Sequence, residues 1–273
     1  MSCDFITFKE KASYMETLLR YDLGSGIVAF STTRHGGVSE GSYAAFNCTS
    51  YTGDDPHHVA ENRRRLLTLL PGVKQLVIPR QTHSCHVLEI DDTYLMAMPG
   101  ERHEMLQGVD ALVTRLPHLC LCISTADCIP ILLHDSVHGA IGAVHAGWRG
   151  TVGRILRQTL RIMHGRYGTM GSDIHAVIAP GISLPAFEVG DEVVEAFREA
   201  GFPLEMISEW YPQTHKYHLD LPMANFLQLQ EFGVPASQIT FSRHCTFSEP
   251  DNFFSARRLG IASGRMLSGI AMV

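Results

Sequence analysis

The sequence lacks an excess of positive charge, and this argues against several classes of partner. Its 273 residues carry 22 Lys and Arg against 28 Asp and Glu, which gives a formal net charge of −6. Phosphate backbones and anionic membranes attract proteins through cationic patches. The run Arg63, Arg64, Arg65 lies in a helical pattern, where we expect it to form the solvated face. We therefore predict neither a nucleic-acid partner nor a membrane partner.

Long apolar runs and paired cysteines are also missing. The N-terminal stretch 1–19 contains acidic residues, and no later stretch approaches the roughly 18 to 20 apolar residues that span a bilayer. The seven cysteines are an odd number and contain no Cys-x-x-Cys pair, which argues against a disulfide framework. We expect a cytoplasmic protein with reduced thiols.

Strand-like runs of apolar and β-branched residues are frequent between turn signals. Four of them follow one another through short connections between residues 110 and 146, which favours antiparallel or mixed pairing over a repeated βαβ pattern. The nine predicted strands are 26–33, 75–81, 85–91, 110–115, 119–125, 129–135, 140–146, 174–180 and 239–245.

Amphipathic helices are predicted at 57–72, 151–168, 188–201 and 220–233. In the second of these, we expect Thr151 to be the N-cap and Gly168 to lie at the C-terminal end. The chain shows no linker, repeat or low-complexity tract. The sequence therefore indicates one α+β domain over residues 1–273, with mixed sheets and helices packed outside them.

Three side chains with metal-binding chemistry follow or end predicted strands. His83 closes "RQTH", Cys128 lies in "TADC" and His145 closes "AVHAG". One thiolate and two imidazoles suit a zinc ion whose fourth position stays open. The structural alternative is a buried cysteine with two hydrogen-bonded histidines, because free cysteine is commonly buried.

Two further interpretations use the same residues. Cys128 could be a nucleophile activated by His145, with Asp127 or Asp110 orienting the histidine. Copper is also bound by two histidines and a cysteine, but such sites usually add an axial methionine. No methionine lies close to Cys128 or His145 in the sequence, and the 15 histidines include no His-x-His pair. We therefore consider copper less suitable than zinc.

Two arginines could bind an anion. Arg149 lies beside the predicted start of the 151–168 helix, where backbone N–H groups favour an oxyanion or phosphate. Arg34 follows another predicted strand and precedes Gly36 and Gly37, which permit a close turn against a ligand. The structural alternative for Arg149 is an ion pair with an acidic neighbour.

Eight motifs resemble the YfiH-type family in order and across nearly the whole chain. Members of this family have been labelled polyphenol oxidases or laccase-domain proteins, and later purine nucleoside phosphorylases. The motifs are "STTRHGGVSEGSY", "GDDPHHVAENRRRL", "RQTHSCHV", "DALVT", "TADCIPILLHD", "GAVHAGWRGT", "IAPGISLPAFEVGDEV" and "LDLPMANFLQL".

The resemblance implies a single-domain α/β sandwich and a zinc site made by His83, Cys128 and His145. It also implies phosphate-dependent cleavage of adenosine, inosine, guanosine and methylthioadenosine, together with adenosine deamination. Some members are instead linked to hydrolysis of an amide in muramyl-nucleotide precursors of peptidoglycan. "QTH" replaces the usual "QVH" here, and threonine is also β-branched.

Further side chains complete the candidate site. We place Asp127 and Arg149 with the three ligands in the catalytic set. Arg34, Asn47 and Arg149 are the candidates for binding substrate or phosphate. A non-enzymatic nucleoside-binding module is the remaining alternative, and the oligomeric state is not predicted.

Overall fold

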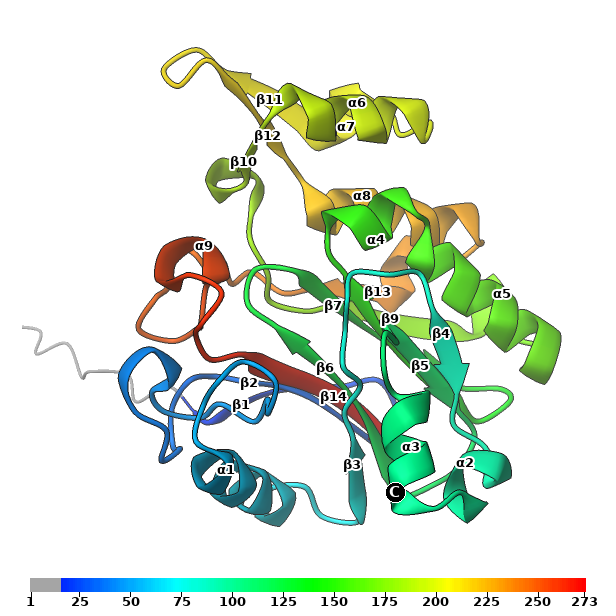
Figure 1. The fold of residues 1–273 in the computed structure, drawn as a ribbon. Helices are drawn as coiled ribbons and strands as arrows, with labels where there is room; N and C mark the ends of the chain where they lie inside the picture. Colours follow the sequence, from blue (N-terminus) through cyan, green and yellow to red (C-terminus); the bar gives the residue numbers. More distant parts are fainter. Residues whose placement is uncertain (1–15) are drawn as a thin grey trace, which may run out of the picture.

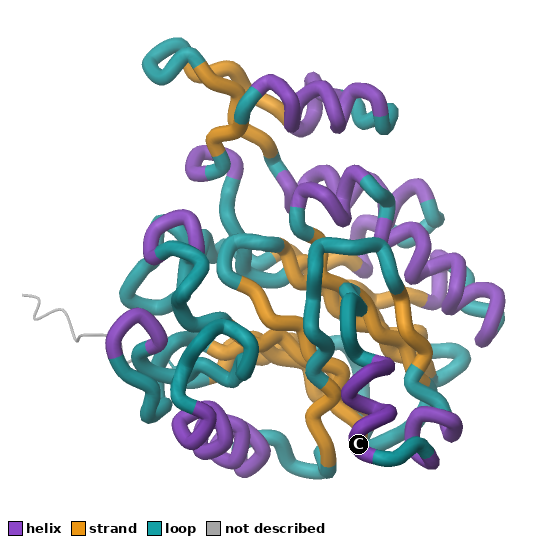
Figure 2. The backbone as a smooth tube through the Cα atoms, viewed as in Figure 1, coloured by secondary structure: helices purple, strands orange, loops and turns teal. Residues whose placement is uncertain are grey.

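Two large β-sheets face each other in the computed structural model, which describes residues 16–273 (Figures 1 and 2). The first sheet has the order β1 (Leu18–Tyr21), β2 (Ile27–Thr32), β14 (Met266–Met272), β6 (Leu119–Thr125) and β3 (Gln75–Val77). The second has the order β13 (Ile239–Phe241), β9 (Ile174–Ile178), β7 (Ile129–Asp135), β8 (Ala140–Ala146), β5 (Ala111–Thr114) and β4 (Val87–Glu89).

Side chains that alternate between the two faces of each strand form the core between these sheets. In β6, Leu121 and Ile123 belong to the cluster shared with Leu132 of the second sheet. Cys120 and Cys122 belong to a different cluster, which includes Leu66 of α1 (Pro56–Thr68). Successive side chains of a strand point to opposite faces, so β6 is buried on both sides. This accounts for its continuous apolar run.

Helices cover the outer faces of the sandwich. Besides α1 on the first sheet, α4 (Trp148–Val152), α5 (Ile155–Tyr167) and α8 (Leu221–Glu231) cover the second. A small sheet of β10 (Glu188–Val189), β12 (Lys216–Leu219) and β11 (Ser208–Tyr211) projects beyond them (Figure 1). The remaining α-helices are α2 (Asp92–Met96), α3 (Pro99–Met105), α6 (Asp191–Glu199), α7 (Leu204–Ile207) and α9 (Ala256–Leu259).

The predicted fold class is confirmed, and each of the nine predicted strands overlaps an observed one. The pairing is mixed: β7 pairs antiparallel with β8 and β9, whereas β3 pairs parallel with β6. β1, β10, β11, β12 and β14 were not predicted. The single domain over residues 1–273 stays a prediction, and residues 1–15 of that range lie outside the described part. Over residues 16–273, no helix combines the length and the apolar character that crossing a membrane requires.

The predicted 151–168 helix is wrong at its start. Thr151 lies inside α4, buried, where its hydroxyl accepts a hydrogen bond from Asn225. The chain then breaks before α5, because Arg154 adopts a left-handed conformation with φ 61° and its guanidinium lies 3.7 Å from the Phe202 ring centroid. Gly168 ends α5 with φ 83°, as predicted.

Candidate metal centre and active-site cavity

The three predicted ligands come together at one end of the sandwich. His83 lies in the loop after β3, Cys128 in the turn between β6 and β7, and His145 near the end of β8. One nitrogen or sulfur atom from each of the three lies within 4.8 Å of the others. Cys128 Sγ is 3.6 Å from His83 Nε2. Tetrahedral zinc with ordinary Zn–S and Zn–N bond lengths separates its sulfur and nitrogen ligands by about 3.5 Å, so this geometry fits such an ion.

Asp110 positions two of these ligands through hydrogen bonds. Its Oδ1 is 2.7 Å from His145 Nδ1, which leaves the Nε2 edge of that ring for a ligand. The same buried carboxylate accepts hydrogen bonds from the backbone N–H groups of Thr82, His83 and Ser84. A carboxylate behind a ligating histidine fixes its tautomer and orientation. Asp110 therefore holds both His145 and the loop that carries His83.

The charges of this cluster stabilise one another. Burial raises the pKa of the Cys128 thiol, but the positive charge and hydrogen bonding of His145, followed by those of His83, lower it to about 6. Burial lowers the pKa of His145, yet Cys128 and Asp110 together raise it to about 9. For Asp110, burial is outweighed by hydrogen bonding and charge from His145, so its pKa falls to about 2. The thiolate needed for metal binding is thus favoured at neutral pH.

Gly147 leaves the space in which the ligands meet. A Cβ atom built at this position would lie 2.9 Å from Cys128 Sγ and 3.0 Å from His83 Cδ2. The φ of Gly147 is −69°, a value that any residue can adopt, so the constraint is steric contact with the ligands and not backbone conformation. The motif "HAGWRG" therefore supplies a ligand and also the gap beside it.

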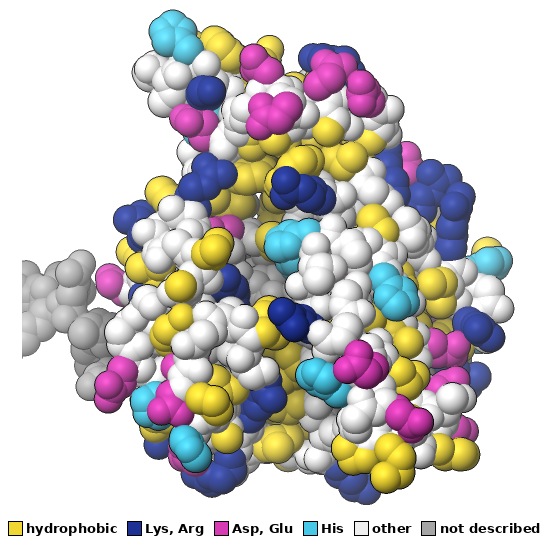
Figure 3. Space-filling view, in the orientation of Figure 1, with side chains coloured by type: hydrophobic (Ala, Val, Ile, Leu, Met, Phe, Trp, Pro, Cys, Tyr) yellow, Lys and Arg dark blue, Asp and Glu magenta, His cyan; other side chains and the backbone are white. Residues whose placement is uncertain are grey.

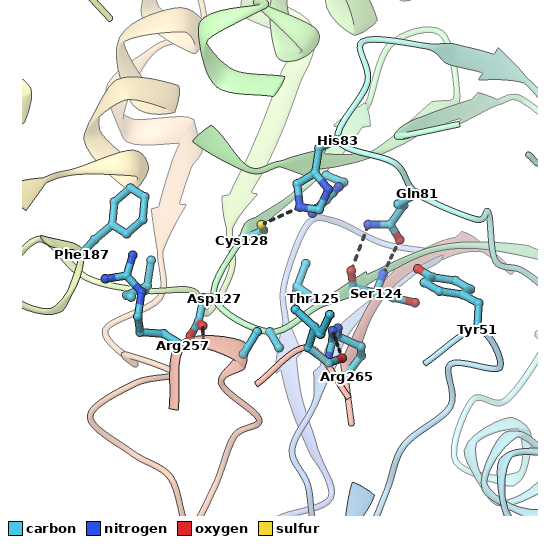
Figure 4. Close-up of a pocket in the computed structure, with 15 residues that line it drawn as sticks. Tyr51, Gln81, His83, Ser124, Thr125, Asp127, Cys128, Phe187, Arg257 and Arg265 are labelled. Atoms are coloured by element: carbon cyan, nitrogen blue, oxygen red, sulfur yellow. Dashed lines mark hydrogen bonds between the residues drawn. The ribbon is translucent and has the colours of Figure 1, made fainter. Parts of the chain in front are cut away.

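A cavity of about 550 Å³ opens onto the cluster. Figure 4 shows Phe187 and Arg257 on one side of His83 and Cys128, with Gln81, Ser124 and Tyr51 on the other. Figure 3 shows a hollow on the same face of the molecule. The cavity is lined by Tyr51, Gln81, His83, Ser124, Thr125, Ala126, Asp127, Cys128, His145, Ile182, Phe187, Ala256, Arg257, Ile261 and Arg265.

Asp127 lines this cavity but does not orient His145. Its Oδ1 accepts a hydrogen bond from the Thr246 hydroxyl at 2.8 Å, and its Oδ2 accepts one from the Arg257 backbone N–H at 2.7 Å. Of the two carboxylates proposed from the sequence, Asp110 is the one that contacts the histidine. Asp127 instead ties the Cys128 turn to α9, the short helix that carries Arg257.

Three predicted binding residues lie elsewhere. Arg149 is exposed, with its guanidinium carbon 4.3 Å from the Trp148 ring centroid, and it is not among the described residues that line the cavity. Arg34 donates to the carbonyls of Ala44 and Pro250. Asn47 is buried and its amide connects Thr49, Asp54 and the backbone N–H of Arg265. Neither Arg34 nor Asn47 is among the described residues that line the cavity.

Arg257 and Arg265 supply the cationic side chains of the cavity, and sequence reasoning missed both. Arg265 is held by its own loop, donating from Nη1 to the carbonyl of Ser263 and from Nη2 to that of Ile261. Arg257 lies over the Phe187 ring at 5.4 Å and donates to the carbonyl of Glu188. Neither follows a predicted strand, so no pattern marked them. Gln81, which bonds the backbone of Ser124 through both amide atoms, lay within the quoted "RQTH" motif.

A sandwich with this topology is found in solved structures. The protein YfiH from Bacillus licheniformis superposes with a TM-score of 0.86 at 30% identity, over 94% of this chain and 97% of that one. YlmD from Geobacillus stearothermophilus gives a TM-score of 0.85 at 34% identity, over 97% and 98% of the two chains. The fold and site thus define a mixed α/β protein of the YfiH and YlmD type.

The family follows from sequence comparison. Residues 28–273 match the family model described as "Multi-copper polyphenol oxidoreductase laccase". A protein of Bacteroides thetaiotaomicron named purine nucleoside phosphorylase is 52% identical over 97% of both chains. Adenosine deaminase RL5, from an unknown prokaryotic organism, is 47% identical over 90% of this chain and 94% of its own length. The chain belongs to this YfiH-type, laccase-domain family.

The side chains that could bind a metal can be compared with the copper named in that family description. Within residues 16–273, the structure gathers two clusters of three or more side chains with ligand chemistry: the cavity site, and Asp135 with His138 and Asp173. In the second, Asp135 Oδ1 accepts the backbone N–H groups of Val137 and His138, which closes a turn. The His, Cys, His set fits a single ion, whereas a multinuclear copper centre needs further histidines.

Proposed function

We propose that the protein is a zinc-dependent purine nucleoside phosphorylase that also deaminates adenosine. The observation that carries this proposal is the meeting of His83, Cys128 and His145 beside a cavity that two arginines line. The names of the similar proteins support both reactions. Inosine, guanosine and methylthioadenosine are the further substrates that the family resemblance suggests.

The chain's own residues would prepare the site. Zinc, when bound, would supply a Lewis acid at the cavity floor. Asp110 orients His145, and Gly147 leaves room for the ligands to converge. The walls at Phe187 and Tyr51 offer aromatic surface for a purine base. Asp127, with a carboxylate fixed in the cavity wall, is placed to accept a hydrogen bond from a ribose hydroxyl.

Phosphate would be held by Arg265 and Arg257. Guanidinium groups bind phosphate through paired, charge-assisted hydrogen bonds. Arg265 uses Nη1 and Nη2 for hydrogen bonds with residues 261–264, and within residues 16–273 its Nε–H has no partner. Arg149, the phosphate residue expected from the sequence, is exposed over Trp148. We therefore assign the phosphate role to the arginines that line the cavity.

A cysteine hydrolase is the second candidate, and one observation favours it. Cys128, His145 and Asp110 form a relay in which a carboxylate orients an imidazole that lowers the pKa of a thiol. This is the arrangement that activates a nucleophilic cysteine. His83, 3.6 Å from the same sulfur, has no necessary role in such a hydrolase but is a natural third ligand for zinc. Amide hydrolysis in a muramyl-nucleotide precursor belongs to this alternative.

The deciding experiment begins with protein whose zinc content has been measured. This protein is incubated with adenosine in the presence and in the absence of phosphate, and the products are identified by mass spectrometry. The proposal expects adenine and ribose 1-phosphate only with phosphate, and inosine in either condition. A parallel incubation with a muramyl-nucleotide precursor tests the hydrolase. Cleavage of that precursor by zinc-free protein, with no adenosine turnover by the zinc-loaded form, would reject the proposal.

A further inference from the structure

A second depression adjoins the active-site cavity and lies along β3, between α1 and α3 (Figure 1). It consists of two connected hollows of about 310 and 390 Å³. Both hollows share Arg63, Ile78 and Leu106 as walls. Tyr51 lines the inner hollow and also the active-site cavity. Tyr51 is thus a wall common to the cavity with the metal site and to this depression, which we call the β3 groove.

The β3 groove is cationic although the chain as a whole is acidic. Arg63 and Arg80 line the inner hollow together with His103, and Lys74 lines the outer one. Among the described residues that line either hollow, none carries a carboxylate. A concave surface lined by positive charges concentrates anions near it. The β3 groove is therefore a local positive surface on a chain whose net charge is −6.

Arg63 is fixed toward the groove by the fold. Its Nε donates to the carbonyl of Cys48 at 2.7 Å, and its Nη2 lies 3.4 Å from the Ser50 hydroxyl. Its neighbours Arg64 and Arg65 both pair with Glu61 on the helix surface. The expectation that all three arginines form a solvated face is thus wrong for Arg63. Holding a guanidinium in place reduces the entropy lost when it binds a ligand.

Arg80 also lines the inner hollow, and its guanidinium is free to bind a ligand. Its backbone is fixed by hydrogen bonds with Leu106 and Gly108, whereas within residues 16–273 its guanidinium forms no ion pair or hydrogen bond. Two arginines that face one hollow, with one anchored and one free, can bind the oxygens of a phosphate group through paired hydrogen bonds.

We propose that the β3 groove is an anion subsite that binds a phosphate group beside the active-site cavity. The group is either the phosphoryl end of a nucleotide whose base lies in the cavity, or free inorganic phosphate. The first source would make phosphorylated nucleosides ligands of this protein, and it rests on the proposed purine function. The second source does not depend on that function.

Calorimetric binding to the zinc-loaded protein separates these sources. The probes are inosine, inosine 5′-monophosphate and inorganic phosphate, each measured alone in a buffer free of other phosphate. Inosine has no amino group to lose, and its phosphorolysis needs phosphate, so the probes are not consumed. The test variants are Arg80→Gln and Lys74→Gln. Arg64→Gln is the matched control, because Arg64 pairs with Glu61 on the exposed face of α1.

If the nucleotide is the source, its phosphoryl group should tighten binding over inosine by about tenfold or more, as expected for hydrogen bonds to a charged group. Arg80→Gln should remove that advantage, Lys74→Gln should reduce it, and Arg64→Gln should retain it. If free phosphate is the source, inosine and its monophosphate should bind alike, and Arg80→Gln should weaken phosphate binding about tenfold. Unchanged affinities for all three probes in Arg80→Gln would overturn the subsite.

Adenosine turnover on the same preparations distinguishes this failure from failure of the proposed function. Turnover with unchanged probe affinities would reject the β3 groove and leave the phosphorylase proposal standing. Phosphate binding that depends on Arg80, without turnover, would reject the phosphorylase and keep the subsite.

Discussion

Asp110 Oδ1 lies 2.7 Å from His145 Nδ1, while the same carboxylate receives the backbone N–H groups of residues 82–84. One buried side chain therefore sets the positions of two candidate ligands that are 62 residues apart (145 minus 83) in the sequence. Removing its charge should affect the metal site before it affects the rest of the fold.

We predict that Asp110→Asn weakens zinc binding by about 10- to 100-fold, the usual effect of removing a carboxylate behind a histidine ligand. The amide carries an NH₂ group that cannot accept the backbone N–H groups on that side. Competition with a chelator of known affinity measures the change. Asp220→Asn, which alters the N-cap of α8, is the control and should leave zinc affinity unchanged. Equal affinities for wild type and a folded Asp110→Asn would remove Asp110 from the site.

The Cys128 thiol gives a prediction about pH. Its pKa, lowered to about 6 despite burial, means that zinc-free protein should be alkylated at Cys128 with a rate that rises through about pH 6. An ordinary cysteine would show this rise near pH 8.5, about 2.5 pH units higher. Bound zinc should suppress the reaction at every pH, because it occupies the thiolate. Peptide mass spectrometry assigns the modified residue and uses Cys85 as an internal comparison.

The outcome for Cys128 also separates the two candidate functions. The phosphorylase proposal expects activity to vanish on chelation and to return with zinc. Activity that survives complete chelation and is lost on alkylation of Cys128 would favour the cysteine hydrolase.

Arg265 and Arg149 form a matched pair for the phosphate role. Arg265→Lys should raise the KM for phosphate by about tenfold or more, because a point charge cannot replace a paired guanidinium contact. Arg149→Lys, at an exposed position outside the cavity, should change it little. Initial rates of adenosine phosphorolysis measure both, and deamination on the same preparation controls for damage to the metal site. The reverse order would restore Arg149 as the phosphate residue.

The strands could be predicted because their cause is local. β6, β7 and β8 are buried along their whole lengths, and each appears in the sequence as an unbroken apolar run. β14 was missed although it lies in the middle of the first sheet, because Ser268 and Gly269 interrupt its apolar pattern. Gly269 is needed there because a Cβ atom would come within 2.8 Å of Phe30 and Cys120. That requirement arises from tertiary packing.

The cavity could be predicted only at its metal end. His83, Cys128 and His145 have side chains with distinctive chemistry next to predicted strands, so their meeting could be expected. Phe187 and Arg265 reach the same cavity from loops whose paths depend on the whole fold. The place of Arg149 outside the lining of the cavity has the same origin, since its position relative to the cavity depends on where α4 begins.

Gly147 leaves the space in which the metal ligands meet, and its substitution tests directly whether the site needs that space. Because φ is −69°, Gly147→Ala causes no backbone strain, but the new methyl group would lie 2.9 Å from Cys128 Sγ. We expect a clear loss of zinc affinity, with a destabilisation of about 1 to 3 kcal/mol from overpacking. Gly165→Ala is the control, because its Cβ meets no atom within 4 Å and the position lies on the exposed face of α5. That control should retain zinc and gain about 0.5 to 1 kcal/mol from helix propensity. Chelator competition and thermal unfolding measure the two effects separately. Full zinc affinity in Gly147→Ala would mean that the ligands meet the ion farther from Gly147 than their positions here imply.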